Sequence, residues 1–367
     1  MKQLTKSIKQ EAKKIGFDLV GIARAEPLTK IYNILKYRKK NNDLPAFMTE
    51  DIKKATNPKM HLQNAESIIS LAISYASSER INGEYNISIY AQGNDYHQIM
   101  KNKLNQLKSF ISSRVNAKMI SYVDTGSLME RAFARKAGLG WIGKNTNLIN
   151  SKYGSYLFLG EIITNLTLEY DKQVSNKCGS CQLCINNCSG DALIHPYYLK
   201  SDKCIGYITQ KKGIIPFAER IKIEDNLWGC DRCQQVCPFN ENIPQNIHKE
   251  FKTNLSGYNL KDILDFSRKN PPSSWVKAAL SWRGIRILKR NALIIIANKN
   301  LQKYKNEVIK NISDPSPIIR AYALWAFSKL EKEKAFDLLR EKYFEEKNNM
   351  VRNEIKRIFN NNSRREL

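Results

Sequence analysis

The eight cysteines of this chain constrain its fold more than any other feature, because all of them lie within residues 178–237 of 367. The first run, CGSCQLCINNC, has the spacing with which bacterial ferredoxins hold a 4Fe-4S cluster. The second run, CDRCQQVC followed by Pro238, is one cysteine short of that spacing, and Cys204 can supply it. In ferredoxins the last cysteine of a run binds the neighbouring cluster. We therefore assign one cluster to Cys178, Cys181, Cys184 and Cys237, and a second to Cys188, Cys204, Cys230 and Cys233.

Zinc and disulfides are the alternative uses of these cysteines. Zinc is held by paired C-x2-C motifs, but the third and fourth cysteines at this spacing suit a cubane cluster better than one tetrahedral ion. Disulfides need an oxidising compartment, and the first residues of the chain lack an apolar signal core. Iron-sulfur clusters are the favoured interpretation, and we expect a cytoplasmic protein.

Length and composition predict a globular protein of two or three domains. No apolar run approaches the roughly eighteen residues that a membrane span needs. Lys and Arg number 60 against 35 Asp and Glu, which gives a net charge of +25. This excess favours a polyanionic partner, and the absence of a basic amphipathic anchor favours nucleic acid over membrane.

The pattern along the chain predicts an α+β protein of three domains. Residues 1–170 are expected to form an α/β domain, and 171–245 a ferredoxin-like module that its clusters hold together. Residues 246–367 are expected to be entirely helical. Within the first domain we expect strands at 18–23, 67–75, 87–91 and 118–123, a helix at 96–115, and a hairpin of strands 146–150 and 155–164.

Asp124 follows a predicted strand and is the leading catalytic candidate. Reactive groups of α/β proteins gather beyond the carboxyl ends of strands, although a carboxylate there can also be a simple turn former. The next residues, Ser127-x-x-Glu130, predict a capping box at the start of a helix. Gly138 and Gly140 then either let the backbone approach a flat ligand or cap that helix.

The helical tail is strongly basic. Between positions 268 and 310 there are eleven Lys or Arg and a single acid, Glu307. A helix predicted over 282–297 has one apolar face and an arginine-bearing face, which favours phosphate contacts over a merely solvated surface. Similar segments near positions 290, 320 and 352 indicate helical repeats of the HEAT kind.

Two clusters carry single electrons, so they imply an external donor and an acceptor. The chain has no P-loop, no complete GxGxxG and no Ser-His-Asp arrangement, and its four histidines are scattered. We therefore expect an organic or corrin cofactor in the first domain, with Asp124 available to give a proton.

Five segments, in this order, resemble the epoxyqueuosine reductase family over nearly the whole chain: VDTGSLMERAFARKAGLGWIGKNT, GSYLFLGEIIT, CGSCQLCINNCSGDAL, KCIGYITQKKGIIP and GCDRCQQVCPFN. The resemblance implies a cobalamin-dependent enzyme with two 4Fe-4S clusters. Such an enzyme removes the epoxide oxygen of epoxyqueuosine at the wobble position of tRNA, the last step of queuosine synthesis. Asp124 matches the family's proton donor, a role for which we expect a raised pKa.

The resemblance also implies binding residues. The corrin is expected beside the cluster that contains Cys204, with contacts from Asp124, Leu148, Gly206, Tyr207, Cys230 and Asp231. Independently of the resemblance, the basic helical tail gives the expected tRNA contacts, which are Arg283, Arg286, Lys289, Arg290 and Arg320. The chain departs from the family at Gln92, at Gly206 and at Ser189, where the family tends to have arginine, serine and proline. We expect a monomer that receives electrons from a separate donor.

Two other functions are compatible with the cysteine pattern. A reductive dehalogenase shares the corrin and two clusters, but it has no use for a basic helical tail. An electron carrier fused to an RNA-binding tail leaves the first 170 residues without a task.

Overall fold

The computed structural model describes residues 1–361 except 47, 49, 50, 80, 82, 256, 268 and 270. Arg268, the first residue of the basic stretch counted above, therefore lies outside the described residues. The chain forms two compact units. Unit 1 comprises Met1–Glu79, Asp95–Cys204 and Asp231–Lys252, and unit 2 comprises Arg80–Asn94, Ile205–Cys230 and Thr253–Leu367. The functional division into 1–170, 171–245 and 246–367 remains a prediction.

Unit 1 is built on a four-stranded sheet with the strand order β1-β2-β7-β4. Its strands are β1 (Leu19–Arg24), β2 (Ser67–Ser74), β7 (Leu157–Thr164) and β4 (Met119–Tyr122). All three pairings are antiparallel. The strands predicted at 18–23, 67–75 and 118–123 are confirmed, but the expected α/β arrangement is wrong for this sheet, because that arrangement requires parallel strands.

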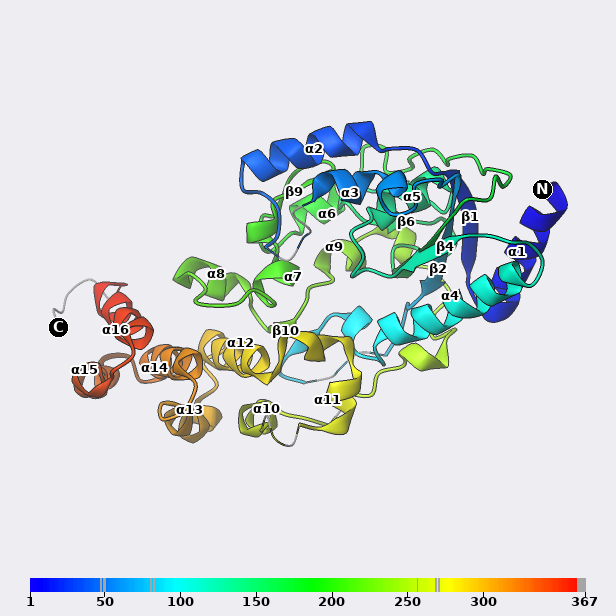
Figure 1. Cartoon of the computed structure of the whole chain (residues 1–367). Helices are drawn as coiled ribbons and strands as arrows, with labels where there is room; N and C mark the ends of the chain where they lie inside the picture. The colour runs from blue at the N-terminus through cyan, green and yellow to red at the C-terminus, as the bar shows by residue number, and fades with distance from the viewer. Residues whose placement is uncertain are drawn as a thin grey trace. The chain divides into compact units, whose positions relative to one another are not determined.

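Helices cover both faces of this sheet (Figure 1). On one face α4 (Tyr96–Ser112) packs on β7, where Gly160 leaves room for Met100 and Leu104. On the other face lies α5 (Glu130–Lys136), whose Phe133 is buried with Ile68 and Ile163. Gly160 and Ile163 face opposite sides because side chains alternate along a strand. The first sixty residues also form the α-helices α1 (Lys2–Ile15), α2 (Thr29–Lys40) and α3 (Ile52–Thr56). Of these, α1 packs on α4.

The predicted hairpin of 146–150 and 155–164 is wrong. β6 (Leu148–Ile149) pairs with β5 (Trp141–Ile142), whereas β7 pairs with β2 and β4. An isolated bridge joins Asn150, the last residue of the first predicted strand, to Gly154, which precedes the second. Alternation of apolar residues shows which face of a strand is buried, but it does not identify the partner strand.

The cysteine-bearing stretch contains only short elements. In unit 1 these are α6 (Leu183–Asn186), β8 (Leu193–His195), β9 (Tyr198–Leu199) and α9 (Arg232–Gln235). In unit 2 they are α7 (Ile205–Ile208), α8 (Phe217–Lys222) and β10 (Asn226–Trp228), which pairs with β3 (Asn86–Ile87). The strand predicted at 87–91 is thus shorter than expected, and residues 89–91 form a 3-10 turn. Such short elements bury little surface, which is consistent with clusters that stabilise this stretch.

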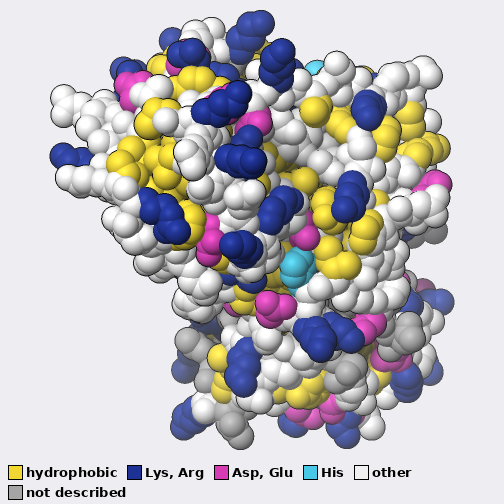
Figure 2. All heavy atoms as spheres, turned by 90° about the vertical axis from the view of Figure 1, so that its right-hand side faces the viewer, with side chains coloured by type: hydrophobic (Ala, Val, Ile, Leu, Met, Phe, Trp, Pro, Cys, Tyr) yellow, Lys and Arg dark blue, Asp and Glu magenta, His cyan; other side chains and the backbone are white. Residues whose placement is uncertain are grey.

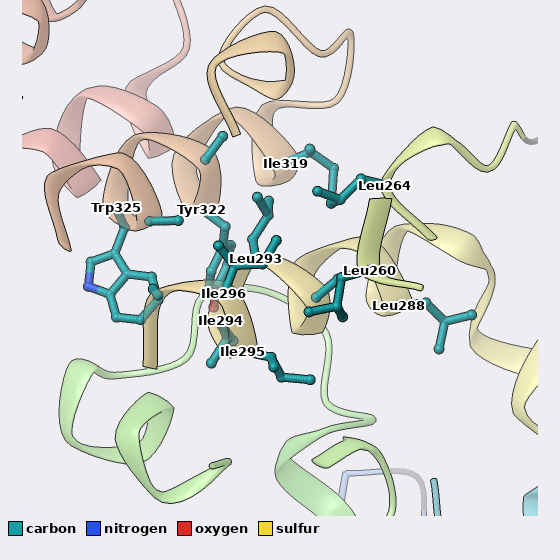
Figure 3. Close-up of a cluster of buried hydrophobic side chains, with 14 of the residues drawn as sticks. Leu260, Leu264, Leu288, Leu293, Ile294, Ile295, Ile296, Ile319, Tyr322 and Trp325 are labelled. Atoms are coloured by element: carbon teal, nitrogen blue, oxygen red, sulfur yellow. The ribbon is translucent and has the colours of Figure 1, made fainter. Parts of the chain in front are cut away.

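Unit 2 has a hydrophobic core of its own around α12 (Ile285–Asn298) and α14 (Pro317–Glu331). Leu293, Ile294, Ile295 and Ile296 are all fully buried. The second half of α12 is therefore apolar on every side, not amphipathic as predicted. Figure 3 shows these side chains beside those of α14 and of α10 (Leu260–Asp265).

The tail is helical, as predicted, and α14 packs on both α12 and α16 (Asn349–Asn361). Its other helices are α11 (Ser273–Lys277), α13 (Lys305–Asn311) and α15 (Ala335–Glu345). A fully buried ion pair, Arg220 Nη2 to Glu354 Oε1 at 2.7 Å, joins α8 to α16. The HEAT-like repeat itself remains a prediction. Within the described ranges, no helix has the length and apolar character that crossing a membrane requires.

Candidate functional site

Four cysteines assigned to one cluster come together in unit 1. Cys178 and Cys237, far apart in the chain, pack in one hydrophobic cluster with Trp141. Burial raises the pKa of the Cys237 thiol, and the neighbouring Cys178, Cys184 and Cys181 raise it further. The arrangement supports the crossover assignment, which places Cys237 with the first run of cysteines and not with its own.

Backbone N–H groups face the sulfur atoms of this group. Cys184 Sγ accepts a hydrogen bond from Ile185, and Cys237 Sγ accepts one from Phe239. Both bonds oppose the effect of burial on the thiol pKa. Donors of this kind stabilise the thiolate, which is the form of cysteine that binds iron.

The second predicted set of ligands is divided between the units. Cys188, Cys204 and Cys233 belong to unit 1, while Cys230 is the last residue of a unit 2 segment. Cys188 Sγ accepts a hydrogen bond from the N–H of Ala192 at 3.3 Å. The helices α6 and α9, which lie close in the chain to Cys188 and Cys233, pack on each other. The assignment of this second set remains a prediction.

The chemistry of the first thiol group fits an iron-sulfur cluster. All eight cysteines are within the described ranges, and none forms a disulfide. The four thiolates of a cubane cluster bind four different irons, so they need not converge on one point. Among the residues that the structure describes, no three His, Cys, Asp or Glu side chains gather as ligands of a single ion.

Asp124 lies just after β4, in a left-handed conformation (φ 50°) that Asp adopts more readily than most residues. Its side chain is 63% exposed. Tyr96 Oη donates a hydrogen bond to Asp124 Oδ2 at 2.9 Å, and His97 Nε2 lies 3.5 Å from the same oxygen. On its other side, His97 Nδ1 contacts Asp95 Oδ1 at 2.7 Å. The first turn of α4 thus organises Asp124, although the sequence pattern singled out none of these neighbours.

These contacts determine where the proton resides. Desolvation would raise the pKa of Asp124, but the hydrogen bonds from His97 and Tyr96 and the charge of His97 hold it below its ordinary value. The raised pKa expected for Asp124 is therefore wrong for the protein by itself. Burial lowers the pKa of His97, but hydrogen bonds to Asp124 and Asp95 outweigh it and raise this pKa to about 9. At neutral pH the proton of the pair is on His97.

Glu130 is a second acid beside Asp124. Its Oε1 accepts a hydrogen bond from the backbone N–H of Asp124 at 2.6 Å, and α5 begins without a side-chain cap. The predicted capping box is therefore wrong, because Glu130 bonds to Asp124 and not to the backbone of Ser127. Desolvation and the Asp124 charge raise the pKa of Glu130 to about 8. Carboxyl groups whose pKa values are pushed apart are typical of sites that transfer protons.

The two glycines after α5 have a packing role. A Cβ at Gly140 would lie 2.2 Å from the carbonyl oxygen of Ile149, and one at Gly138 (φ 76°) would lie 2.4 Å from that of Lys172. The close backbone approach that these glycines permit is therefore to the protein's own chain. Gly138 also ends α5, because the N–H groups of Gly138 and Leu139 donate to the carbonyl oxygens of Arg135 and Ala134. Of the two interpretations, the structure therefore favours the helix cap over approach to a flat ligand.

The predicted corrin contacts lie in both units. Asp124, Leu148 and Asp231 are in unit 1, and Gly206, Tyr207 and Cys230 are in unit 2. Leu148 is buried in a cluster with Ala23 and Ala134, so its side chain is unavailable and the prediction is wrong for that side chain. Asp124, in contrast, is open to solvent beside protonated neighbours, which suits a site where a reactive cofactor and a proton donor meet.

Two of the predicted RNA contacts are accessible. Arg286 is exposed, and the guanidinium of Arg283 stacks at 3.8 Å on the ring of Trp282, which is itself exposed. An exposed indole beside a guanidinium is a suitable platform for an unstacked base. Positive charge is not confined to the tail, since Lys and Arg side chains are also spread over the face that carries α1 and α4 (Figure 2).

Arg290 is wrong as an RNA contact. Its side chain is completely buried, and its guanidinium donates hydrogen bonds to the carbonyl oxygens of Ile208, Thr209 and Lys211. These bonds tie α12 to the segment after α7. Arg290 therefore stabilises unit 2, and phosphate cannot reach it.

Lys289 and Arg320 already have partners. Lys289 Nζ lies 3.8 Å from Asp314, and Arg320 makes a bidentate pair with Glu346 at 2.8 and 2.9 Å. A phosphate would have to compete with these carboxylates. The two residues are weaker candidates than Arg283 and Arg286.

Two family descriptions match the chain. Residues 56–125 match "Epoxyqueuosine reductase QueG, DUF1730", and residues 177–240 match "4Fe-4S double cluster binding domain". The first match ends directly after Asp124, and the second spans all eight cysteines.

Curated relatives and solved structures match over nearly the whole chain. An epoxyqueuosine reductase of Bacillus anthracis is 33% identical over 97% of this chain and 96% of its own length. One of Staphylococcus aureus is 35% identical over 94% and 93%. A crystal structure of epoxyqueuosine reductase with an epoxyqueuosine-modified tRNA-Tyr stem loop superposes with a TM-score of 0.94 at 31% identity, covering 99% of both chains. The Streptococcus thermophilus structure gives 0.89 at 30% identity, covering 97% and 98%.

Proposed function

This chain belongs to the epoxyqueuosine reductase family, and from that premise we propose that it reduces epoxyqueuosine to queuosine at the wobble position of tRNA. The reaction removes the epoxide oxygen and leaves an alkene. It consumes two electrons and two protons and releases water. Membership of this family favours the reductase over the dehalogenase and electron-carrier alternatives.

The observation that carries the proposal is the presence in unit 1 of both chemical components of such a reaction. The group formed by Cys178, Cys181, Cys184 and Cys237 can hold a cluster that passes single electrons. The open Asp124 with protonated His97 can supply protons. An epoxide is a poor electron acceptor unless its oxygen is protonated as the C–O bond breaks, so both components are needed.

The proposed cofactors are two 4Fe-4S clusters and cobalamin. When bound and reduced, cobalamin would supply a strongly nucleophilic metal centre. Asp124, Asp231, Gly206 and Tyr207 are the residues proposed to hold it, together with the backbone of Leu148. An external donor supplies the electrons, and we place the enzyme in the cytoplasm as a monomer.

The chain's own residues control the proton. Asp95 holds the imidazole of His97 through Nδ1, which directs Nε2 toward Asp124. Tyr96 fixes the carboxylate by its hydrogen bond to Oδ2. The proton stored on His97 is transferred through Asp124 to the departing oxygen, and Glu130, with its pKa of about 8, provides a second proton beside it. Placing the proton on a neighbour allows Asp124 to act although its own pKa is low.

The RNA is proposed to contact Arg283 and Arg286, with Trp282 as a stacking surface. Arg286 is exposed near the start of α12, in contrast to the buried Arg290.

Anaerobic reconstitution with iron, sulfide and cobalamin tests the proposed function. The protein is incubated with a chemical reductant and a tRNA stem loop that carries epoxyqueuosine, and its nucleosides are then analysed by mass spectrometry. We expect a product that has lost one oxygen atom. An unchanged nucleoside in the presence of intact clusters and cobalamin would refute the proposed reaction.

A further inference from the structure

Unit 1 exposes large apolar side chains next to the first cysteine run. Tyr37 of α2, Leu183 of α6, Ile194 of β8 and Tyr197 of the β8–β9 turn are between 44% and 61% exposed. We name these four residues the α2–β8 surface. Apolar side chains exposed together are typical of protein interaction sites.

Packing contacts and hydrogen bonds join the elements of this surface. α6 packs on β8, and β8 pairs with β9. Arg38 Nη2 of α2 donates a hydrogen bond to the carbonyl oxygen of Leu199 in β9 at 2.7 Å, and its guanidinium lies over the ring of Tyr198. Figure 1 accordingly shows α2, β9 and α6 near one another. The four exposed residues thus belong to one continuous part of unit 1.

This surface adjoins the thiol group. The N–H of Tyr197 donates to the carbonyl oxygen of Lys144 at 3.1 Å, and Lys144 Nζ donates to that of Cys181 at 2.8 Å. Asn176 makes a second link between the surface and the thiol group. Its Nδ2 donates to Tyr197 Oη at 3.2 Å, and its Oδ1 accepts from the N–H of Cys178 at 2.8 Å. Cys181 is exposed, while the other seven cysteines are buried or half-buried. A cluster on these ligands would have an edge that a partner can approach.

Helix α2 brings mostly positive charge to this surface. α2, TKIYNILKYRKK, carries five Lys or Arg and no acid. The exposed Lys172 and Lys177 lie in the segment that leads to Cys178. Like charges around an apolar centre steer an oppositely charged protein to that centre and speed its association.

We propose that the α2–β8 surface is the docking site of a small acidic protein that carries single electrons. This inference rests on the proposed function, which requires an external donor. In each encounter the carrier is oxidised by one electron and the cluster on Cys178, Cys181, Cys184 and Cys237 is reduced by one. Two encounters supply the two electrons of one turnover. A small interface suits such brief redox encounters, which bury less than about 1,200 Å².

The test measures the affinity of the reconstituted full-length protein for a purified acidic flavodoxin over a series of salt concentrations. Leu183→Glu and Ile194→Glu place negative charge in the apolar centre and replace no cysteine. We expect each to raise the Kd at least about tenfold. The matched control is Phe344→Glu on α15 of unit 2, where an equally apolar side chain is 74% exposed, and its Kd should equal that of the parent.

Two further measurements separate the possible outcomes. With dithionite, a small reductant that needs no docking site, both variants should keep the parent's iron content and turnover. Parent-like flavodoxin affinity in both variants, or no flavodoxin binding by the parent at low salt, would overturn the proposal. So would a variant that loses affinity for the tRNA stem loop and not for flavodoxin, since that result would identify an RNA surface. If the parent binds flavodoxin but fails with dithionite, the proposed function is wrong and the docking site stands.

Discussion

At neutral pH the proton next to Asp124 is held by His97, and this distribution follows from local contacts. His97 lies between two carboxylates, Asp95 and Asp124, whose hydrogen bonds outweigh its burial. Asp124 is stabilised as an anion by the same imidazole and by Tyr96. A positively charged donor beside a low-pKa carboxylate keeps a proton ready without requiring a neutral acid to be buried.

Asp124→Asn tests the carboxylate. The amide keeps nearly the same shape and can still accept the hydrogen bond from Tyr96, but it cannot pass on a proton. We expect turnover to fall by about 10²- to 10⁴-fold, the usual contribution of a positioned acid. Affinity for the tRNA stem loop and iron content should not change. Turnover equal to that of the parent would remove Asp124 from the mechanism.

His97 predicts how stability depends on pH. The pKa of His97 is raised from an ordinary 6.5 to about 9 on folding, so its stabilising contribution is complete below pH 6.5 and is lost as pH rises through 9. The pKa of Glu130 is raised from 4.5 to about 8, so its contribution to stability is also lost as pH rises, over a lower pH range. Urea unfolding of the parent should show a falling free energy between pH 6.5 and 9.

The matched variant for this pH effect is His97→Gln, which should show a smaller fall over the same range. It should also raise the pKa of Asp124, because the neighbouring cation is gone. If the pH dependence of unfolding is identical in parent and variant, His97 does not hold the proton.

The sequence pointed to Asp124 but not to its partners. A carboxylate after a predicted strand is recognisable locally, whereas His97 and Tyr96 approach it only after α4 has packed on the sheet. The misassigned capping box has a similar cause. Ser127 and Glu130 have the correct spacing, but the left-handed turn at Asp124 places its own N–H closer to Glu130. Asp95-Tyr-His97 at the start of a predicted helix was the available signal, since Asp95 is the N-cap of α4.

At the scale of elements, the pairing of the cysteines can be tested by two double substitutions. Cys178→Ser with Cys237→Ser removes two ligands of one cluster in the crossover arrangement, so the protein should retain about four irons. Cys178→Ser with Cys204→Ser damages both clusters and should leave fewer. Iron and sulfide analysis of anaerobically reconstituted protein distinguishes them. Equal iron in the two variants would contradict the crossover.

Strand positions were predictable where a short apolar run has turn residues on both sides. β2 is such a run and is buried on both faces, whereas β4 agreed with its predicted strand although all four of its residues are only half-buried. Partner choice was not predictable, and β7 was therefore assigned to a hairpin although it pairs with β2 and β4. The amphipathic pattern predicted for α12 requires Arg290 to be a surface residue. It is instead buried, with carbonyl partners that only the tertiary structure supplies.

At the scale of the whole molecule, the chain interleaves its two units, and no local composition change marks where it passes between them. The chain passes into unit 2 after Cys204 and back into unit 1 after Cys230, both within the cysteine-bearing stretch. Domain boundaries placed at the ends of that stretch therefore could not reproduce the two units. The net charge of +25 was a more direct guide, because it predicts a polyanionic partner whatever the fold.

The tRNA proposal belongs to this scale, because the salt dependence of binding counts the phosphates that the entire protein contacts. Arg286→Ala should weaken binding of the stem loop and reduce the slope of log Kd against log salt by about one. Lys329→Ala, which removes an exposed charge of α14 outside the predicted contacts, is the control and should change neither. If the two variants behave alike, Arg286 is not an RNA contact.

In the proposed reaction, eight thiolates hold two clusters that feed electrons to the site of Asp124. This can be tested by metal analysis of the native protein, isolated and kept without oxygen. We expect about eight irons and eight sulfides per chain, with the electron paramagnetic resonance signal of reduced 4Fe-4S clusters after dithionite. Zinc in their place, or eight cysteines that react as metal-free thiols, would contradict it.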